Sequence, residues 1–277
     1  MSGFVALLGS PGSAVSPQLL GGMTRFLASL GSDSAATWSD GAVGMGHALL
    51  RTTPEAARER QPCTLDGTAW LAGDVRLDAR GELCAALRSG GRAPAESLPD
   101  AELVLHTYHA WGTECAAHLL GDFSFVVWDT RARRLFGARD QLGGRPFFHA
   151  RAGEMLVAST SLDCVRMHPD VSSELDDRTV ADFLLTGGNR EPGSTFFRGV
   201  HRLPAAHALV CEPGSAPRVF RYWEFPVEEP LRHRRAADYV EEYRDHLRRA
   251  VRERLRGMPV SVLMSGGLDS TLVTAVA

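Results

Sequence analysis

The residues with the most specific chemical pattern form the sequence SGGLDS near the end of the chain. Gly266 and Gly267 allow the backbone to approach an anion closely and to adopt positive φ. Their N–H groups, with those of a following helical turn, can point at bound phosphate oxygens. The hydroxyls of Ser265 and Ser270 can donate to the same oxygens, and Asp269 can hold Mg²⁺ or its water ligands. The pattern predicts a loop that binds the pyrophosphate group of a nucleotide.

Two secondary-structure elements have to position this loop. The preceding residues 259–264, PVSVLM, predict a strand buried on both faces, as in a parallel sheet, and a helix is expected from Leu272 onward. A loop between such a strand and a helix lies where open α/β sheets bind ligands. The loop has neither the GxxxxGK[ST] nor the GxGxxG pattern. An ordinary glycine-rich turn is the alternative, but strand, S-G-G-x-D-S and helix together favour a nucleotide site.

A long amphipathic helix is expected before this strand. Residues 236–256 carry an apolar stripe at helical spacing, and Gly257 and Pro259 are expected to end the helix. Upstream, the segment EFPVEEPLRHRR combines prolines with dense charge, which is typical of a linker. We therefore expect a linker at 223–235 and, at 236–277, the beginning of an incomplete α/β domain.

Residues 1–222 predict a separate domain that contains many strands and few helices. β-Type runs lie at residues 4–9, 42–50 and 69–77, on both sides of a charged turn at 129–133, and around Ala152 and Gly153, while helical patterns lie at 18–30 and 100–111. Asp100 is expected to be the N-cap of the second helix. The succession predicts an α+β sandwich rather than a series of βαβ units.

The composition excludes several classes of protein. The 277-residue chain has a formal net charge of −3 and is 44% hydrophobic, which gives no reason to expect nucleic acid or a membrane as partner. The five cysteines include no CxxC pair, which argues against a zinc site or a disulfide framework. The sequence has no signal-peptide pattern and no apolar run long enough to span a bilayer. We therefore expect a soluble, cytoplasmic protein.

The loop and three other segments resemble a known protein family. SGGLDS after an apolar run resembles the pyrophosphate-binding loop, or PP-loop, of the N-type ATP pyrophosphatases. GDFSFVVWDTRARRLFGARDQLGGRPFFH, STFFRGVHRLPAAHALV and RYW resemble the N-terminal domain and linker of B-type, glutamine-hydrolysing asparagine synthetases, and the resemblance extends over residues 3–277. It implies an Ntn-hydrolase-type αββα sandwich, as in class II glutamine amidotransferases, followed by the start of an α/β PP-loop domain.

The resemblance also implies an activity and its cofactors. Members of the family use ATP and Mg²⁺ to adenylate a carboxylate, which an amine or ammonia then captures as an amide. Carried over onto this chain, the ATP-binding residues are Leu263, Ser265, Gly266, Gly267, Asp269 and Ser270, with Asp269 as the Mg²⁺ ligand. The substrates implied are a small-molecule or peptide carboxylate and an amine donor, with glutamine and ammonia as candidates.

The amidotransferase site departs from the family pattern at its nucleophile and its oxyanion hole. Ntn chemistry uses a nucleophile on the first residue of the mature chain, whose α-amino group acts as base. The family begins Met-Cys-Gly, whereas this chain places Ser2 at the nucleophile position. The family's Asn-Gly-Glu matches Ala72, Gly73 and Asp74, so the Gly73 N–H remains but Ala72 has no donor. Losing one oxyanion donor costs about a hundred- to a thousand-fold in rate.

The glutamine-binding residues of the family are retained only in part. The arginine for the glutamine carboxylate, in the pattern HxRL, matches Leu49, and Arg51 on the same strand face is the candidate replacement. The acid that holds the glutamine amino group matches Asp100. We therefore expect a retained fold with an impaired glutaminase. Arg139 and Asp140, in the family's RDxxGxxP stretch, are interpreted as an ion pair that holds the hairpin.

Three functions remain open at this point. The first is an asparagine-synthetase-like ligase, and the second is a glutamine-independent cyclase or ligase of natural-product biosynthesis, similar to lasso-peptide cyclases or β-lactam synthetases. The third is a non-catalytic remnant that binds a partner through exposed Val262, Leu263, Leu272 and Val273. Because the sequence stops at Ala277, just after the PP-loop, we expect a truncated chain whose partner is a missing synthetase portion or a second copy in a homodimer.

Overall fold

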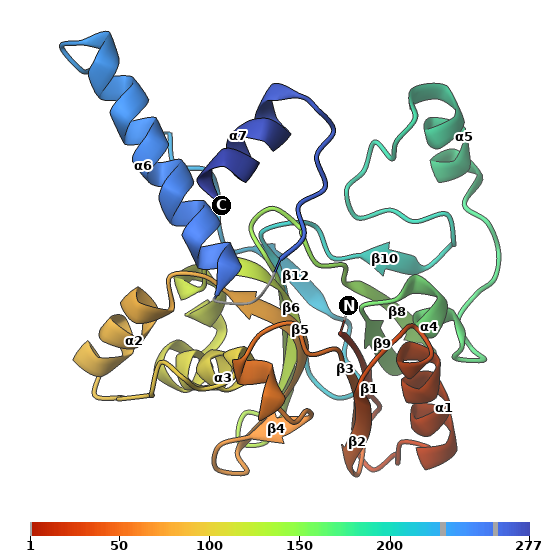
Figure 1. The fold of residues 1–277 in the computed structure, drawn as a ribbon. Coiled ribbons are helices and arrows are strands. Elements are labelled where there is room, and N and C mark those ends of the chain that lie inside the picture. The colour runs from red at the N-terminus through yellow and green to blue at the C-terminus, as the bar shows by residue number, and fades with distance from the viewer. Residues whose placement is uncertain (1, 228–230, 257–259) are drawn as a thin grey trace. The chain divides into compact units, whose positions relative to one another are not determined.

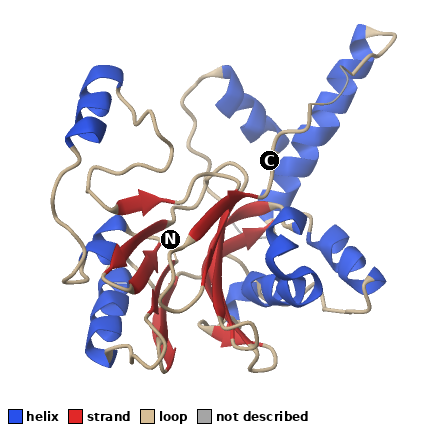
Figure 2. Cartoon of the chain, turned by 180° about the vertical axis from the view of Figure 1, so that it is seen from behind, coloured by secondary structure: helices blue, strands red, loops and turns tan. Residues whose placement is uncertain are grey.

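The computed structural model describes residues 2–227, 231–256 and 260–277. The chain divides into two compact units, Met1–Glu224 and Phe225–Ala277 (Figures 1 and 2). Among the residues described, no helix is both long enough and apolar enough to cross a lipid bilayer.

The first unit contains an antiparallel sheet with its most buried strand near the middle. Its strands are β1 (Gly3–Leu8), β2 (Ser34–Asp40), β3 (Val43–Leu49), β8 (Phe148–Ala152), β9 (Met155–Ser159) and β10 (Val200–Arg202). They follow the order β10-β8-β9-β1-β3-β2. Every residue of β1 is buried, and β1 pairs with β3 on one side and with β9 on the other. The strands predicted at 4–9 and 42–50 are confirmed as β1 and β3.

A second antiparallel sheet packs against the first. Its strands are β4 (Cys63–Thr64), β5 (Ala69–Leu77), β6 (Gly121–Asp129), β7 (Arg134–Arg139), β11 (His207–Cys211) and β12 (Arg218–Arg221). They follow the order β12-β11-β7-β6-β5-β4. The strand predicted at 69–77 is confirmed with the same bounds, and β6 and β7 form the predicted hairpin around the charged turn.

The side chains between the two sheets form an apolar layer because the side chains of a strand alternate between its two faces. Phe4, Ala6 and Leu8 of β1 point into this layer, where they meet residues of the second sheet such as Ala72 and Val126. The intervening residues of β1 point outward instead, toward helices. The same alternation places Ser2 on the inner side of the sandwich, where β5 presents Ala72 and Asp74.

Helices cover the outer faces of both sheets (Figure 2). Helices α1 (Pro17–Ala28) and α4 (Leu162–Arg166) pack on the first sheet, and α2 (Arg80–Ser89) and α3 (Asp100–Trp111) pack on the second. Helix α5 (Asp177–Thr186) follows β9 and α4 along the chain, and short 3₁₀ helices lie at Glu55–Ala57 and Gly112–His118. This layering confirms the predicted αββα sandwich.

One detail of the predicted helix at 100–111 is wrong. Helix α3 has the expected bounds, but its N-cap is Pro99, so Asp100 is the first helical residue rather than the cap. Its carboxylate is instead buried at 3% exposure, where it accepts the Leu77 N–H and forms an ion pair with Arg80. The tertiary ion pair therefore replaces the local cap.

The second unit contains two helices, within the residues described there, and lacks the strand that was predicted. Helix α6 (Ala236–Leu255) confirms the expected amphipathic helix, and α7 (Leu268–Val276) begins four residues before the predicted start at Leu272. Residues 260–264 form no strand, and Leu263 is 96% exposed. Pro259 lies outside the described residues. A strand needs a hydrogen-bonded neighbour, and the described part of this unit offers none.

Candidate active site

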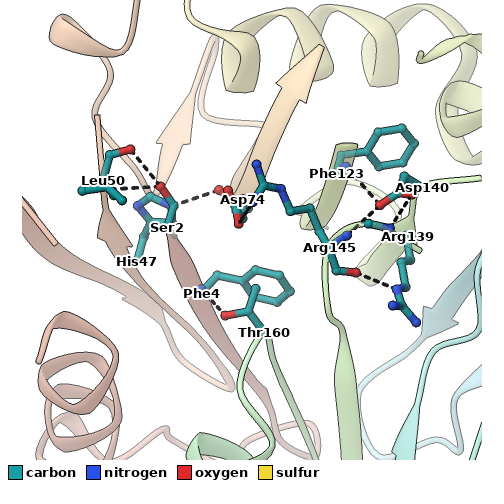
Figure 3. Close-up of polar contacts among 12 residues, drawn as sticks. Ser2, Phe4, His47, Leu50, Asp74, Phe123, Arg139, Asp140, Arg145 and Thr160 are labelled. Atoms are coloured by element: carbon teal, nitrogen blue, oxygen red, sulfur yellow. Dashed lines mark hydrogen bonds and ion pairs between the residues drawn. The ribbon is translucent and has the colours of Figure 1, made fainter. Parts of the chain in front are cut away.

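Ser2 is fixed by the end of the neighbouring strand. Its half-buried hydroxyl accepts the Leu50 N–H at 3.0 Å and donates to the Leu50 carbonyl at 3.3 Å (Figure 3). The next residue, Gly3, pairs with Ala48 of β3, so the position of Ser2 follows directly from the β1–β3 register. The hydroxyl is thus engaged with backbone groups in this conformation.

The N–H of Gly73, expected to be an oxyanion donor, is also engaged. It donates to Oε1 of Gln61 at 2.7 Å, while Nε2 of Gln61 donates to the Gly73 carbonyl at 3.1 Å. Nε2 of His47 contacts the same carbonyl at 2.9 Å. Strand β4 ends the pairing of β5 at Leu71, so the Gln61 side chain takes the place of a neighbouring strand at Gly73. Sequence patterns did not point to Gln61 or His47, because both roles depend on which segments lie beside Gly73 in the folded domain: the residues before β4 for Gln61 and strand β3 for His47.

Positions 72 and 73 are both constrained by packing. Ala72 is fully buried in the apolar layer between the sheets, and its side chain offers no hydrogen-bond donor. A Cβ on Gly73 would lie 2.5 Å from the Cβ of Phe125 and 3.0 Å from the carbonyl oxygen of Ser124. Glycine is therefore required at position 73 by the close approach of β6 as well as by any role of its N–H.

Asp74 and Arg145 form an ion pair that faces Ser2. The Nη1 of Arg145 lies 3.4 Å from Oδ2 of Asp74, and Figure 3 shows both side chains extending toward the Ser2 side of the sandwich. Burial raises the pKa of Asp74 to about 6, opposed by the positive charge of Arg145 and reinforced by the negative charge of Asp122. Position 74 thus holds a carboxyl group whose pKa lies closer to neutral pH than that of an ordinary aspartate.

The predicted ion pair between Arg139 and Asp140 is wrong. Among the residues described, the two side chains do not pair with each other; each binds backbone groups, most of them in the loop after β7. Asp140 accepts the N–H groups of Phe123, Leu142, Gly144 and Arg145. Arg139 donates to the carbonyls of Gly143, Arg145 and Leu203 at 2.6 to 2.8 Å. Both side chains bond to backbone groups rather than to each other, because the backbone groups of the tight loop have no strand partners and need hydrogen bonds. The two residues together fix the backbone of Arg145 (Figure 3).

A cavity of about 530 Å³ opens at the β2 edge of the sandwich, between β2, β3 and residues 57–61 before β4. Leu49 and Arg51 both line it, as expected from their two-residue spacing on one strand face, together with His47 and Gln61. The lining also carries Glu59, whose pKa burial raises. Its size suits a ligand as large as an amino acid.

The structure separates Asp100 from this cavity. Asp100 is not part of the lining, and its carboxylate is committed to Arg80 and to the backbone of β5. The two predicted glutamine-binding residues are thus separated: Arg51 lies at the cavity, beside Leu49 and Gln61, and Asp100 lies behind β5.

The SGGLDS loop of the second unit leads directly into helix α7, and its groups are held together by internal hydrogen bonds, from the Gly267 N–H to Oγ of Ser265 and from Oγ of Ser270 to the Gly267 carbonyl. The Oγ atoms of Ser265 and Ser270 lie 3.2 Å apart, and Gly266 has φ +80° with open space around it. Because α7 begins at Leu268, Asp269 and Ser270 belong to its first turn. Exposed N–H groups of that turn and the two hydroxyls fit the oxygens of a pyrophosphate group.

A magnesium ion fits this loop only together with phosphate. The described residues contain no group of three or more His, Cys, Asp or Glu side chains arranged to hold a metal. Asp269 supplies a single carboxylate at the loop, and Mg²⁺ with one carboxylate completes its shell with water and substrate phosphate oxygens. Leu263, predicted to be part of the nucleotide site, points into solvent at 96% exposure.

The four-layer fold, with a small nucleophilic residue leading into its central strand, is that of an Ntn-hydrolase-type glutamine amidotransferase domain. Residues 1–223 match the family described as "Glutamine amidotransferase domain", and residues 242–277 match "Asparagine synthase". The chain therefore belongs to the glutamine amidotransferase domain family, and its last 36 residues match the asparagine synthase family. These matches confirm the resemblance drawn from the sequence.

Individual relatives agree with this assignment. "Asparagine synthetase [glutamine-hydrolyzing] 3" of Bacillus subtilis is 32% identical over 94% of this chain and 42% of its own length. "Amidase chry2" of Gibberella zeae is 28% identical over 100% of this chain and 42% of its own length. The chain thus spans less than half the length of these relatives.

Solved structures share the fold at low sequence identity. Glutamine phosphoribosylpyrophosphate amidotransferase of B. subtilis, complexed with ADP and GMP, aligns with a TM-score of 0.55 at 14% identity. The alignment covers 80% of this chain and 49% of that one. The likeness establishes the architecture of the amidotransferase domain.

Proposed function

We propose that this chain forms part of an ATP-dependent ligase that adenylates a carboxylate for capture by an amine or by ammonia, with asparagine synthesis as the type reaction. The observation that carries the proposal is the SGGLDS loop, in which Ser265 and Ser270 approach each other at the N-terminus of α7. The match of residues 242–277 to the asparagine synthase family supports it.

The roles of the loop residues follow from their chemistry. ATP would supply the adenylyl group that activates the carboxylate. The hydroxyls of Ser265 and Ser270 would donate to the pyrophosphate oxygens, and Gly266 and Gly267 would keep the backbone clear of side chains. Asp269 would orient the water ligands of Mg²⁺. Helix α7 adds the positive end of its dipole to the same oxygens.

Pyrophosphate binding tests this part of the proposal, because pyrophosphate is the part of ATP that the loop would contact. We expect saturable binding of magnesium pyrophosphate to the chain in calorimetry. Gly266→Ala should weaken it, because alanine is strained at φ +80°. Gly188→Ala is the matched control, since Gly188 lies in an open loop at an ordinary φ. Equal binding by both variants, or none by the parent chain, would contradict the role of the loop.

We infer further that the amidotransferase domain is impaired in glutamine hydrolysis. Three features support this: Ser2 stands at the nucleophile position, Ala72 lacks a donor, and the Gly73 N–H is bound to Gln61. Oxyanion stabilisation requires free donors aimed at the developing charge. In this conformation neither position 72 nor position 73 offers one.

Release of glutamate from L-glutamine measures this activity directly. We expect the parent chain to be slow, and the triple variant Ser2→Cys, Ala72→Asn, Gln61→Ala to gain about a hundredfold or more from a restored nucleophile and donors. Circular dichroism checks that asparagine is tolerated at the buried position 72. Fast hydrolysis by the parent chain would overturn the inference.

The alternative function is a cyclase or ligase of natural-product biosynthesis that needs no glutamine. The same impaired site favours it, since a substrate that carries its own amine makes ammonia unnecessary. The two alternatives differ in the donor: the first forms an amide with added ammonium ion, whereas the second forms product only with an amine-bearing substrate. In both cases we propose a cytoplasmic enzyme with a small-molecule or peptide carboxylate as substrate, working with further synthetase residues or as a homodimer.

A further inference from the structure

A second cavity lies at the edge of the sandwich opposite the cavity that contains Arg51. It has a volume of about 750 Å³ and is lined by residues of β8, β10, β12 and α5. β10 and β12 are edge strands of their sheets, whereas the other cavity lies at β2, the opposite edge strand of the first sheet. None of the roles proposed above uses this cavity.

Two histidines face each other within its lining. His149 of β8 and His201 of β10 are direct cross-strand partners. Their ring centres lie 5.6 Å apart, with an angle of 34° between the ring planes. Two imidazoles bound to one tetrahedral ion, at the usual metal–nitrogen distance, have ring centres about 5 to 6 Å apart. The strand register thus holds the pair at the separation of a two-histidine chelate.

His149 is buried without a hydrogen-bond partner. It is 7% exposed, and no described residue donates to or accepts from its ring nitrogens. Burial, followed by the proximity of His201, lowers the pKa of His149 to about 4. The ring is therefore neutral at pH 7, which is the form that binds a metal. A buried imidazole that faces a polar cavity and lacks a partner is available to a ligand.

The charges around the pair do not exclude a cation. Arg151 donates to the Gly153 carbonyl, and the guanidinium of Arg202 lies over the ring of Phe148. The formal charges of the lining cancel, since Arg151, Arg178 and Arg202 are matched by Asp176, Asp182 and Glu191. A divalent ion would add to a neutral site rather than to a positive one.

We propose that His149 and His201 together bind one divalent transition-metal ion, with water completing its coordination. Imidazole nitrogen suits Zn²⁺, Ni²⁺ and Cu²⁺ rather than Mg²⁺ or Ca²⁺. The described residues add no third side chain to the pair in a metal-holding group, so the site is open on the cavity side. The volume of the cavity leaves room for water or for a ligand bound directly to the ion.

Calorimetric titration of the chain with Zn²⁺, repeated with Ni²⁺, tests the site. We expect saturable binding of one ion per chain that is lost in His149→Ala and in His201→Ala. His201 is exposed, so its variant removes a ligand without disturbing the core. The control is His246→Ala, because His246 and His233 both contact Glu242 in the second unit and could themselves attract metal.

The outcomes separate clearly. Loss of binding in His201→Ala, with His246→Ala unchanged, supports the proposal even if His149→Ala fails to fold in a circular dichroism check. Three results overturn it: no saturable binding by the parent chain, binding that both cavity variants retain, or binding that disappears in His246→Ala. Weak binding of several ions per chain would also overturn it, as adventitious surface binding.

Discussion

The carboxamide of Gln61 binds both backbone groups of Gly73, accepting its N–H at 2.7 Å and donating to its carbonyl at 3.1 Å. Gln61 carries the same functional group as the side chain of a glutamine substrate. Its oxygen thus lies where a substrate oxygen would have to reach the Gly73 N–H. The chain supplies an internal amide to the donor that a glutaminase would keep free.

Removing this amide should cost stability. In Gln61→Ala the Gly73 N–H loses its partner, while the carbonyl keeps its contact with His47. A buried donor left unsatisfied costs about 1 to 3 kcal/mol. Urea denaturation should show a loss of this size, and Gln18→Ala, at an exposed helix position, should show almost none. Equal midpoints for the two variants would mean that water replaces the Gln61 amide at no cost.

Asp74 predicts a specific pH dependence. Its folded pKa of about 6 exceeds the unfolded value of 3.8, so its stabilising contribution is complete below about pH 4 and is lost as the pH rises through 6. Between pH 4 and pH 7, the free energy of unfolding of Asp74→Asn should therefore rise by up to about 3 kcal/mol relative to that of the parent chain. The free energy of unfolding, measured across that range, provides the check.

Asp66→Asn is the opposite-sign control for this series. Hydrogen bonds from Thr68 lower the pKa of Asp66, so that carboxylate stabilises the fold at higher pH and loses its effect as the pH falls. As the pH rises, the free energy of unfolding of Asp66→Asn should fall relative to that of the parent chain, whereas that of Asp74→Asn should rise. The same direction in both variants would contradict the effect of burial on Asp74.

Two ion pairs near α2 should differ sharply in energetic weight. Arg80 and Asp100 are buried, so Arg80→Ala leaves an uncompensated charge and should destabilise the fold by about 3 to 5 kcal/mol. Arg88 and Glu96 lie 3.9 Å apart and are more than half exposed, so Arg88→Ala should change stability by about 1 kcal/mol or less. Thermal unfolding of the two variants compares them directly. A small loss of stability in Arg80→Ala would mean that the fold does not depend on the Arg80–Asp100 ion pair. Asp100 would then be available for the glutamine-binding role that the resemblance implies.

The stability of the loop after β7 should depend on the backbone hydrogen bonds that Asp140 accepts rather than on an ion pair. Asp140→Ala leaves the N–H groups of Phe123, Leu142, Gly144 and Arg145 without their acceptor. We expect a loss of about 3 kcal/mol or more, since each hydrogen bond to a charged group contributes about 1.5 to 3 kcal/mol. Asp163→Ala, at an exposed position on α4, is the control. Chemical denaturation measures both, and a loss below that of the control would refute the assignment.

Strong local patterns made most of the sandwich predictable. β5 and α3 have the bounds that alternation and helical spacing indicate, and the hairpin of β6 and β7 follows from a charged turn between apolar runs. β2 escaped notice because Ser34–Asp40 is almost wholly exposed and is held by pairing with β3 rather than by an apolar face. β2 forms because it pairs with β3, and such pairing cannot be read from the spacing of apolar residues in the sequence.

The errors concern residues whose state depends on distant groups. Residues 260–264 have the composition of a buried strand, yet a strand forms only beside a partner. Asp100 is of a residue type that often caps helices, but here its carboxylate is buried in an ion pair with Arg80. At the candidate site, comparison with the family placed Ser2, Ala72 and Gly73 at matching positions, but the contact of Gln61 with Gly73 became visible only in three dimensions.

The central place of β1 has a consequence for the order in which the domain can assemble. β1 is made first, yet one of its neighbours, β9, ends at Ser159. The middle of the first sheet therefore cannot close during synthesis until more than half of the chain has left the ribosome. Pairings that join such distant segments form slowly, and their apolar strands stay exposed in the meantime. β1 thus depends on a strand about 150 residues further along the chain to complete its pairing.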